Sequence, residues 1–433
     1  MKKKSYITSA VMALGVFLVL PAAMASASDE QLARDLELLR NKVAAQQEHI
    51  DALEGKLEKK SGGSGANEGK QEKKSEGQVV LGNEFIDQLK LKGDLRVRYE
   101  ARDIDYKDGK GSDYSRERWR TRFRVGGVWE NKAENWQVGA GLATGSDDPT
   151  STNATYSETK PFETGDIRLD YAYAKNKWND FSLTIGQAEN PYTSSWVFWD
   201  SDVRLSGLTA QYGQKDGVFA VLGEYAAKLV HDDNTATLTA SQAGYRGEAS
   251  GVKYTLAGGY HLYSKSLLND ASATFFLDKI DAEKYKLNIG DLYGDVSIPL
   301  GEVKVKLYGQ LWKNFGADGL VGQSQAGSSF TKTPQDANLG YVFGADGKYG
   351  PFSLGLAYSL VEADSLFGYL SDSDFGDGLS KTNKKGYRVQ LGYELSKNWN
   401  TSLSWLSYKR AEDFASAKED HVNLAQLDVN YKF

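Results

Sequence analysis

Residues 89–102, LKLKGDLRVRYEAR, and 118–129, RWRTRFRVGGVW, alternate residue by residue between an apolar and a charged series. In the second run Trp119, Phe123 and Val125 share one face, and the arginines occupy the other. A period of two is the side-chain alternation of a β-strand, whereas a helix would distribute the arginines around its circumference. Both runs are therefore predicted to be strands with one apolar face and one ionic face.

The composition favours many strands joined by turns, because the 433 residues include 45 Gly, 25 Tyr and 9 Trp but only 7 Pro. The mean hydropathy of -0.52 is low. That value is compatible with a transmembrane β-barrel, in which only alternate residues face lipid. One large barrel is thus preferred to two or three soluble domains.

Residues 1–27 have the pattern of a secretory signal peptide: three lysines, an apolar core and small residues at the end. Beyond it, no stretch approaches the roughly 18 apolar residues of a spanning helix. Removing the three lysines changes the formal charge from -6 to -9, so a nucleic-acid partner is not expected. The absence of cysteine excludes a lipid-modified cysteine anchor, c-type haem attachment, thiolate metal sites and disulfides.

Residues 28–58 are predicted to form a coiled-coil helix, because apolar residues recur at alternating spacings of four and three. The seam consists of Leu32, Leu36, Leu39, Val43, Gln46, Ile50, Leu53 and Leu57. It corresponds to about 40 Å of helix. An alternative is a single amphipathic helix docked on a neighbouring domain. Residues 59–82 are polar and glycine-rich without a period, which is typical of a flexible linker.

From residue 83 to the end, alternating segments are separated by gaps of two lengths. The short gaps are 130–135, 176–180, 213–217, 247–251, 299–302, 348–351 and 396–398. The long gaps are 103–115, 145–165, 188–202, 231–235, 265–283, 315–337, 362–384 and 411–420. Seven short gaps interleaved with eight long ones predict sixteen antiparallel strands, with tight periplasmic turns and longer outer loops.

Aromatic residues cluster beside the short gaps, for example Trp129 with Trp136 and Tyr393 with Trp399. Such positions suit the headgroup boundary of a membrane. The opposite face of the strands is ionic or glycine, as for a water-filled lumen. Two soluble β-sandwiches, such as an exported binding protein would have, also alternate polar and apolar residues and remain an alternative.

The chain ends in NYKF (430–433), with Leu427, Val429, Tyr431 and Phe433 alternating to a terminal aromatic residue. Together with the strands LKGDLRVRYE and RERWRTRFRVGG and the seam, this end resembles Gram-negative outer-membrane porins, in particular those with an N-terminal periplasmic coiled coil. The resemblance implies insertion among outer-membrane lipid and lipopolysaccharide by the barrel assembly machinery, which would read Tyr431 and Phe433. It also implies a homotrimer, and the periplasmic coil is expected to reach peptidoglycan. Asp428 departs from the glycine that such assembly signals often have.

The third outer loop, residues 188–202 (AENPYTSSWVFWDSD), is the candidate constriction, because the third loop of trimeric porins folds inward. The resemblance makes Glu189, Asp200 and Asp202 its acidic contributors and Trp196 and Trp199 its packing anchors. An ordinary surface loop is the alternative.

Inward-facing arginines opposite this loop would create a transverse field across the lumen. The candidate pore-lining residues are Arg96, Arg98, Arg118, Arg120, Arg122, Arg124 and Arg168. Arginines at this spacing repel one another unless water, acidic partners or anionic solutes compensate. The functional hypothesis is a preference for small anions such as carboxylates or phosphate. In the alternative, Asp94, Glu100 and loop carboxylates compensate the arginines structurally.

Bond chemistry is not expected, because none of the four histidines lies near a serine and a carboxylate in a recognisable motif. His231 with the two following aspartates lacks the spacing of a metal site, and the aspartates at 372, 374 and 377 resemble a calcium loop only loosely. The sequence therefore predicts a porin without cofactor or metal. The alternatives are the barrel sleeve of a porin-cytochrome conduit and an outer-membrane hydrolase using His261 or His421.

Overall fold

The two alternating runs form the two longest strands of the protein, β1 (Leu89–Asp105) and β2 (Tyr114–Asn131). In this computed structural model, Trp119 and Phe123 are 51% and 40% exposed on the outer face, whereas Arg98 and Arg120 are 5% and 8% exposed on the inner face. The strands pair antiparallel with Arg98 opposite Arg120. The predicted alternation therefore separates a lipid-facing surface from an ionic interior.

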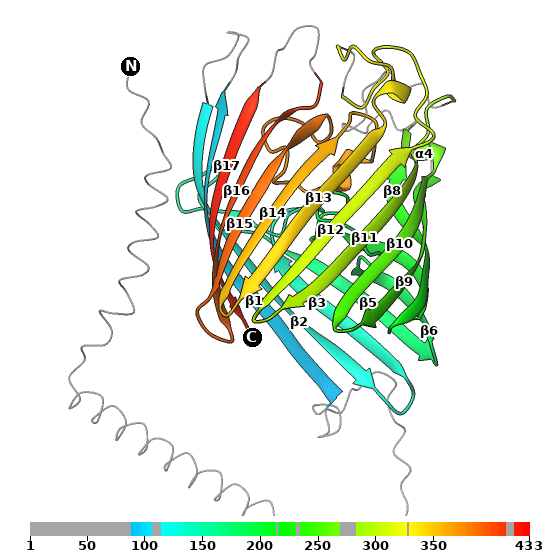
Figure 1. Ribbon diagram of the computed structural model, residues 1–433, viewed down its shortest axis with the longest axis vertical. Helices are drawn as coiled ribbons and strands as arrows, with labels where there is room; N and C mark the ends of the chain where they lie inside the picture. The colour runs from blue at the N-terminus through cyan, green and yellow to red at the C-terminus, as the bar shows by residue number, and fades with distance from the viewer. Residues whose placement is uncertain are drawn as a thin grey trace, which may run out of the picture. The chain divides into compact units, whose positions relative to one another are not determined.

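One antiparallel sheet of seventeen strands closes on itself, because β1 pairs with both β2 and β17 (Figure 1). The further strands are β3 (Trp136–Thr144), β4 (Ala154–Thr155), β5 (Ile167–Trp178), β6 (Phe181–Glu189), β7 (Arg204–Tyr212), β8 (Gly217–Val230), β9 (Asn234–Ala249), β10 (Val252–Tyr263), β11 (Asn288–Leu300), β12 (Val303–Asn314), β13 (Leu339–Tyr349), β14 (Phe352–Val361), β15 (Lys384–Glu394), β16 (Trp399–Arg410) and β17 (His421–Lys432). Since β4 has two residues, sixteen long strands build the wall, as predicted.

The structure describes residues 88–105, 114–213, 215–230, 234–268, 283–326, 329–412 and 420–433. Within these ranges the helical elements are α4 (Lys265–Leu268) and the 3-10 turns η2 (Pro334–Asp336) and η3 (Gly368–Leu370). No helix in this part of the chain is long and apolar enough to cross a bilayer. The predicted signal peptide, coiled coil and linker, and the His231 segment, lie outside the described residues.

The predicted alternation of short and long connections is confirmed except between β8 and β9, where three residues (231–233) separate the strands, fewer than the four of the short turn 213–216. Short connections are tight turns with left-handed backbone at Asn179 (φ 54°) and Gly251 (φ 78°), as two-residue hairpins require. One element was not predicted: β4 lies within the second long loop and pairs with β2, opposite Arg120 and Thr121. A two-residue strand is too short to produce a periodic pattern.

A band of exposed and half-buried aromatic rings follows the short-turn end of the barrel, as the sequence predicts. The ring centroids are 4.9 Å apart for Trp129 and Trp136, 4.9 Å for Phe181 and Tyr212, 4.9 Å for Phe352 and Tyr393, and 4.7 Å for Trp399 and Tyr431. These pairs join neighbouring strands around the wall. Their position is that of an interfacial girdle at the periplasmic boundary.

The C-terminal residue completes the barrel closure. Phe433 N donates to Gly93 O at 3.1 Å, and Gly93 N donates to Phe433 O at 3.0 Å. A Cβ atom at position 93 would lie 2.4 Å from the Phe433 ring and 2.6 Å from the carbonyl oxygen of Arg124. Glycine is thus needed here for close approach of the last residue to the first strand.

We expect Gly93→Ala to reduce the fraction of folded barrel, because the added methyl group must displace either Phe433 or the β2 backbone. Heat-modifiable gel mobility measures that fraction. The matched control is Gly294→Ala, where the nearest heavy atom would be 3.8 Å from the new Cβ. Equal folded fractions for the two variants would contradict the closure described here.

Candidate functional site

The inner faces of β1 and β2 carry a set of eight arginines that we call the arginine ladder. Its members are Arg96, Arg98, Arg102, Arg116, Arg118, Arg120, Arg122 and Arg124. The register places Arg96 opposite Arg122 and Arg98 opposite Arg120. Strand alternation alone thus gathers the guanidinium groups on one part of the lumen wall.

Carboxylates on the wall itself neutralise part of the arginine ladder. Asp94 lies 2.8 Å from Arg122 and 2.7 Å from Arg124. Glu100, which is 0% exposed, lies 3.0 Å from Arg116 and 2.6 Å from Arg118. Glu100 also lies 3.6 Å from Arg120. Asp94 and Glu100 are the wall carboxylates that the sequence names as structural partners of the arginines, and they join two and three arginines, respectively.

Arg98 has a bidentate partner on the last strand. Its Nε and Nη2 donate to the two carboxylate oxygens of Asp428 at 2.7 and 2.9 Å. Asp428 is the residue that departs from the usual assembly signal. Its side chain supplies a buried ion pair across the β1–β17 closure.

Loop L7 (residues 362–383, between β14 and β15) supplies the other main group of counter-charges. Asp374 lies 3.0 Å from Arg98, and Asp377 lies 2.6 Å from Arg102 and 2.5 Å from Arg116. Burial alone would raise the pKa of Asp374, but Arg98 and Arg120 lower it to about 2. In the sequence these aspartates resemble a calcium loop only loosely. Their actual partners are arginines, and the two carboxylates keep L7 against the wall.

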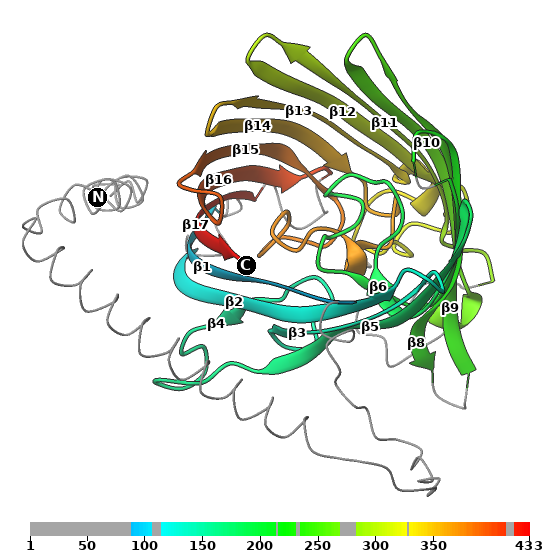
Figure 2. The ribbon, with the colours of Figure 1, turned by 90° about the horizontal axis from the view of Figure 1, so that it is seen from below.

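Loop L3 (residues 190–203, between β6 and β7) lies inside the barrel together with L7, as the green and orange loops of Figure 2 show. Tyr192 donates to Ala240 O on β9 at 2.9 Å. Ser195 N and Oγ donate to Gln310 Oε1 on β12 at 2.8 and 2.6 Å. L3 therefore reaches from β6 to the inner faces of distant strands, as the resemblance to trimeric porins implies.

The candidate acidic residues of L3 have different surroundings. Asp202 accepts hydrogen bonds from Thr152 N and Oγ at 3.0 and 2.9 Å and lies 3.4 Å from Arg124. Asp200 accepts from Ser373 N of L7 at 3.1 Å. Burial, with the neighbouring Asp372 and Asp202, raises the pKa of Asp200 to about 8. Asp202 therefore faces the arginine ladder, whereas Asp200 joins L3 to L7.

Neither Glu189 nor Arg168 forms an ion pair or hydrogen bond with the arginine ladder in the part of the chain that the structure describes. Glu189, the last residue of β6, lies 3.4 Å from the Lys92 ammonium, and both side chains are more than half exposed. Arg168 donates to the carbonyl oxygens of Ser146 and Asp148. It therefore holds the second long loop, and the structure does not bring it together with the other candidate arginines.

The packing anchors are placed inside the barrel as expected. Trp199 is 4% exposed, and its ring centroid lies 5.8 Å from His261. Trp196 packs edge-on against Phe375 of L7, with centroids 5.6 Å apart, and the Arg388 guanidinium lies 4.0 Å from its ring centroid. Both indoles thus fix the position of L3 through aromatic and cation–π contacts.

A family model described as "Putative porin" matches residues 106–243 and 301–433, which is more than half of the chain. The chain belongs to this porin family. It is therefore an outer-membrane β-barrel channel and not an enzyme, as the sequence predicts.

Solved porin structures align with this porin at low sequence identity. Pseudomonas putida OprB aligns with a TM-score of 0.52 at 10% identity, over 81% of this chain and 96% of OprB. Salmonella typhi OmpF, in its complex with daunomycin, has a TM-score of 0.47 at 14% identity, over 81% and 99% of the two chains. A Rhodopseudomonas blastica porin triple mutant has a TM-score of 0.45 at 13% identity, over 80% and 100%. At this identity the OprB likeness shows the fold alone. No curated protein sequence matches the chain.

The histidines of the porin barrel have structural contacts. His261, 1% exposed, shares a hydrogen bond of 3.0 Å with Asp291 beneath L3. His421 Nε2 lies 3.0 Å from Ser407 Oγ, and Asn423 lies 3.3 Å from the other ring nitrogen, at the outer end of β16 and β17. Among the described residues, no group of three or more His, Cys, Asp or Glu side chains is arranged to hold a metal ion.

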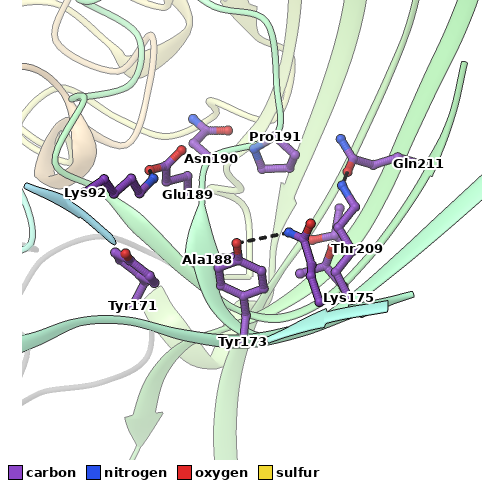
Figure 3. Close-up of a pocket in the computed structure, with 12 residues that line it drawn as sticks. Lys92, Tyr171, Tyr173, Lys175, Ala188, Glu189, Asn190, Pro191, Thr209 and Gln211 are labelled. Carbon is purple, nitrogen blue, oxygen red and sulfur yellow. Dashed lines mark hydrogen bonds and ion pairs between the residues drawn. The ribbon is translucent and has the colours of Figure 1, made fainter. Parts of the chain in front are cut away.

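Three cavities follow the wall below L3. The largest, which we call the L3 cavity, has a volume of about 540 Å³ and includes Arg122, Arg124 and Arg204 in its lining. A second cavity, of about 290 Å³, shares Arg124 and Arg204 with it. Figure 3 shows the third, of about 240 Å³, with Lys92 and Glu189 side by side. Glu189 lines all three cavities.

A chain of buried hydrogen bonds anchors L3, because Gln310 accepts from Ser195 and donates to Asp291 at 2.8 Å, which bonds to His261. We expect Gln310→Leu to loosen L3, since each buried group left unpaired costs about 1–3 kcal/mol. Open-channel current noise should rise and proteolysis within L3 should accelerate. Gln390→Leu on β15 is the control. Current noise and a rate of proteolysis within L3 that are the same in Gln310→Leu as in the wild type would contradict this anchoring.

Proposed function

We propose that this porin conducts small hydrophilic solutes passively and favours anions. The observation that carries the proposal is the charge imbalance at the arginine ladder. Within the described residues, eight arginines face six carboxylates: Asp94, Glu100, Asp202, Asp374, Asp377 and Asp428. Arg96 donates to the amide oxygen of Asn153 at 2.5 Å instead of a carboxylate. A cationic excess on a partly dehydrated wall attracts anions and repels cations.

Partial neutralisation of the arginine charges suits a channel better than complete neutralisation or none. Fully unpaired arginines would repel one another, and a fully neutralised wall would show no preference. Asp202 of L3, 3.4 Å from Arg124, supports L3 as one acidic side of the lumen, with Glu189 and Asp200 as its further proposed contributors. Conduction requires that solutes bind weakly enough to leave. Carboxylates that pair with the arginines keep the binding of a solute anion weak.

Conductance of the purified porin in salts with one bulky ion tests the preference. Replacing chloride by a bulky buffer anion is expected to lower the conductance more than replacing potassium by a bulky cation of similar size. A larger loss on replacing the cation would contradict an anion-favouring lumen.

We also propose that the porin is a homotrimer in outer-membrane lipid and lipopolysaccharide. In this proposal the coil at residues 28–58 lies in the periplasm, where its linker lets it reach peptidoglycan, and the barrel assembly machinery reads Tyr431 and Phe433. Light scattering and cross-linking of the full-length protein are expected to give a trimer, and deletion of residues 28–58 should weaken it. A monomer in both forms would contradict the proposal.

The interior arrangement bears on the cytochrome-sleeve alternative. L3 and L7 contact each other inside the barrel, where Asp200 N donates to Leu370 O at 2.9 Å (Figure 2). Loops joined across the lumen favour a solute channel over a sleeve around a folded cytochrome. Purification from the native membrane without a haem-containing partner is the expected result, and a stoichiometric haem protein would favour the alternative.

A further inference from the structure

The L3 cavity contains a concentration of positively charged hydrogen-bond donors. Arg122 and Arg124 enter it from β2 and Arg204 from the start of β7. Three serines of L3, at positions 194, 195 and 201, also line it. At about 540 Å³ the cavity is in the range of sites for small organic molecules and much larger than a chloride ion.

Three buried donors in this lining lack an acceptor among the described residues: Arg204 Nε and the indole N–H groups of Trp196 and Trp199. Arg204 Nη2 lies 3.2 Å from Asp170, and Nη1 donates to Ser201 O at 3.0 Å, but Nε has no partner. Trp199, 4% exposed, has no partner for its indole N–H. Buried donors are rarely left unpaired, because their lost hydration is costly. The side chains that carry these buried donors line the cavity.

Aromatic rings form the other part of the lining. Tyr192, Trp196 and Trp199 face the cavity from L3. Tyr192 and Trp199 are held by packing against His261, with ring centroids 5.7 and 5.8 Å from it. These two rings are therefore positioned before a solute arrives, and they present a small part of their surface, 6% and 4% exposed, beside the guanidinium groups, with the half-buried ring of Trp196 next to them.

The acidic residues of the lining oppose an anion only weakly at neutral pH. Burial and the neighbouring Asp372 and Asp202 raise the pKa of Asp200 to about 8, so its carboxyl group is mostly protonated. Glu189 is paired with Lys92 at 3.4 Å. Within the lining, three guanidinium groups therefore accompany one ionised carboxylate, and their own partners, Asp94, Asp170 and Asp202, lie outside the lining.

We propose that the L3 cavity is a binding site for aromatic carboxylates, whose carboxylate contacts Arg204 and the β2 arginines while the ring lies against Trp199 and Tyr192. The site rests on the anion preference proposed above and adds solute binding to it. Guanidinium groups match carboxylates with paired hydrogen bonds, and the indole rings select a flat apolar body over a sugar-like one.

Chloride current through the purified full-length porin, titrated with benzoate, tests the site. Benzoate is expected to reduce the current saturably, whereas benzyl alcohol and gluconate should have much smaller effects. Asp170→Asn/Arg204→Gln, which removes both charges of a buried pair, should weaken the benzoate block about tenfold. Trp199→Phe, which keeps a ring but removes the N–H, should weaken it severalfold.

The control is Lys304→Gln/Lys306→Gln, two lumenal cations on β12 outside this cavity. Heat-modifiable mobility verifies folding of every variant. An unsaturable benzoate effect, or equal block in all variants, would overturn the site while leaving an anion-selective channel intact. Saturable block by inorganic phosphate but not by benzoate would overturn the aromatic class. Cation selectivity of the wild type would instead refute the proposed function itself.

Discussion

Replacing Asp374 and Asp377 together by asparagine is expected to raise the anion-to-cation permeability ratio by about twofold or more. The two carboxylates are the L7 partners of Arg98, Arg102 and Arg116, at 3.0, 2.6 and 2.5 Å. Asparagine keeps the size and an acceptor oxygen but removes two negative charges from the lumen. The uncompensated excess at the arginine ladder thereby increases from two charges to four.

The same change should also loosen L7, because breaking a buried ion pair by removing one partner costs several kcal/mol. Reversal potentials under a salt gradient give the permeability ratio, and open-channel current noise measures the mobility of L7. Asp318→Asn/Asp336→Asn, in the long loop between β12 and β13, is the charge-matched control. An unchanged ratio in the L7 variant, or an equal change in the control, would show that L7 does not set the field.

Raising the pH from about 6 to about 9 is expected to weaken the contact between L3 and L7. Burial, with Asp372 and Asp202, raises the pKa of Asp200 to about 8, and burial, with Asp374, raises the pKa of Asp372 to about 6. For a carboxyl group with a raised pKa in the folded state, the stabilising contribution is full at low pH and is lost as the pH rises through that value. Lys384, buried beside both carboxyls, offsets the repulsion only in part.

Conductance and noise measured across this range should therefore rise as Asp200 ionises. In Asp200→Asn the alkaline change should be flattened, because the amide still accepts from Ser373 N at this position. An equal alkaline response in that variant would assign the effect to another group.

Much of the barrel could be predicted from the sequence because strand alternation is a local property. The alternation around Arg120 and Phe123 indicates within a few residues which face of the strand each side chain occupies. The two gap lengths give the number of strands and the end of the barrel at which the long loops lie. The partners across the closure could not be predicted. Arg98 and Asp428 are 330 positions apart, and only the completed ring of strands brings them together.

The candidate site was predicted in part for the same reason. Alternation identified the arginines, and the position of the third loop identified L3. L7 was missed, since a loop without a period does not reveal whether it turns inward. The available signal was its content of closely spaced aspartates in a lumen rich in arginine. The contacts of Arg168 could not be predicted, because they depend on the path of residues 146–148.

The reversal potential of the wild-type porin in planar bilayers under a potassium chloride gradient tests the central claim most directly, when compared with Arg120→Gln/Arg122→Gln. We predict an anion-selective reversal potential for the wild type and a clear shift toward zero for the variant, with Lys304→Gln/Lys306→Gln close to the wild type. Cation selectivity that the loss of Arg120 and Arg122 leaves unaltered would contradict the assignment of the arginine ladder as the selectivity element.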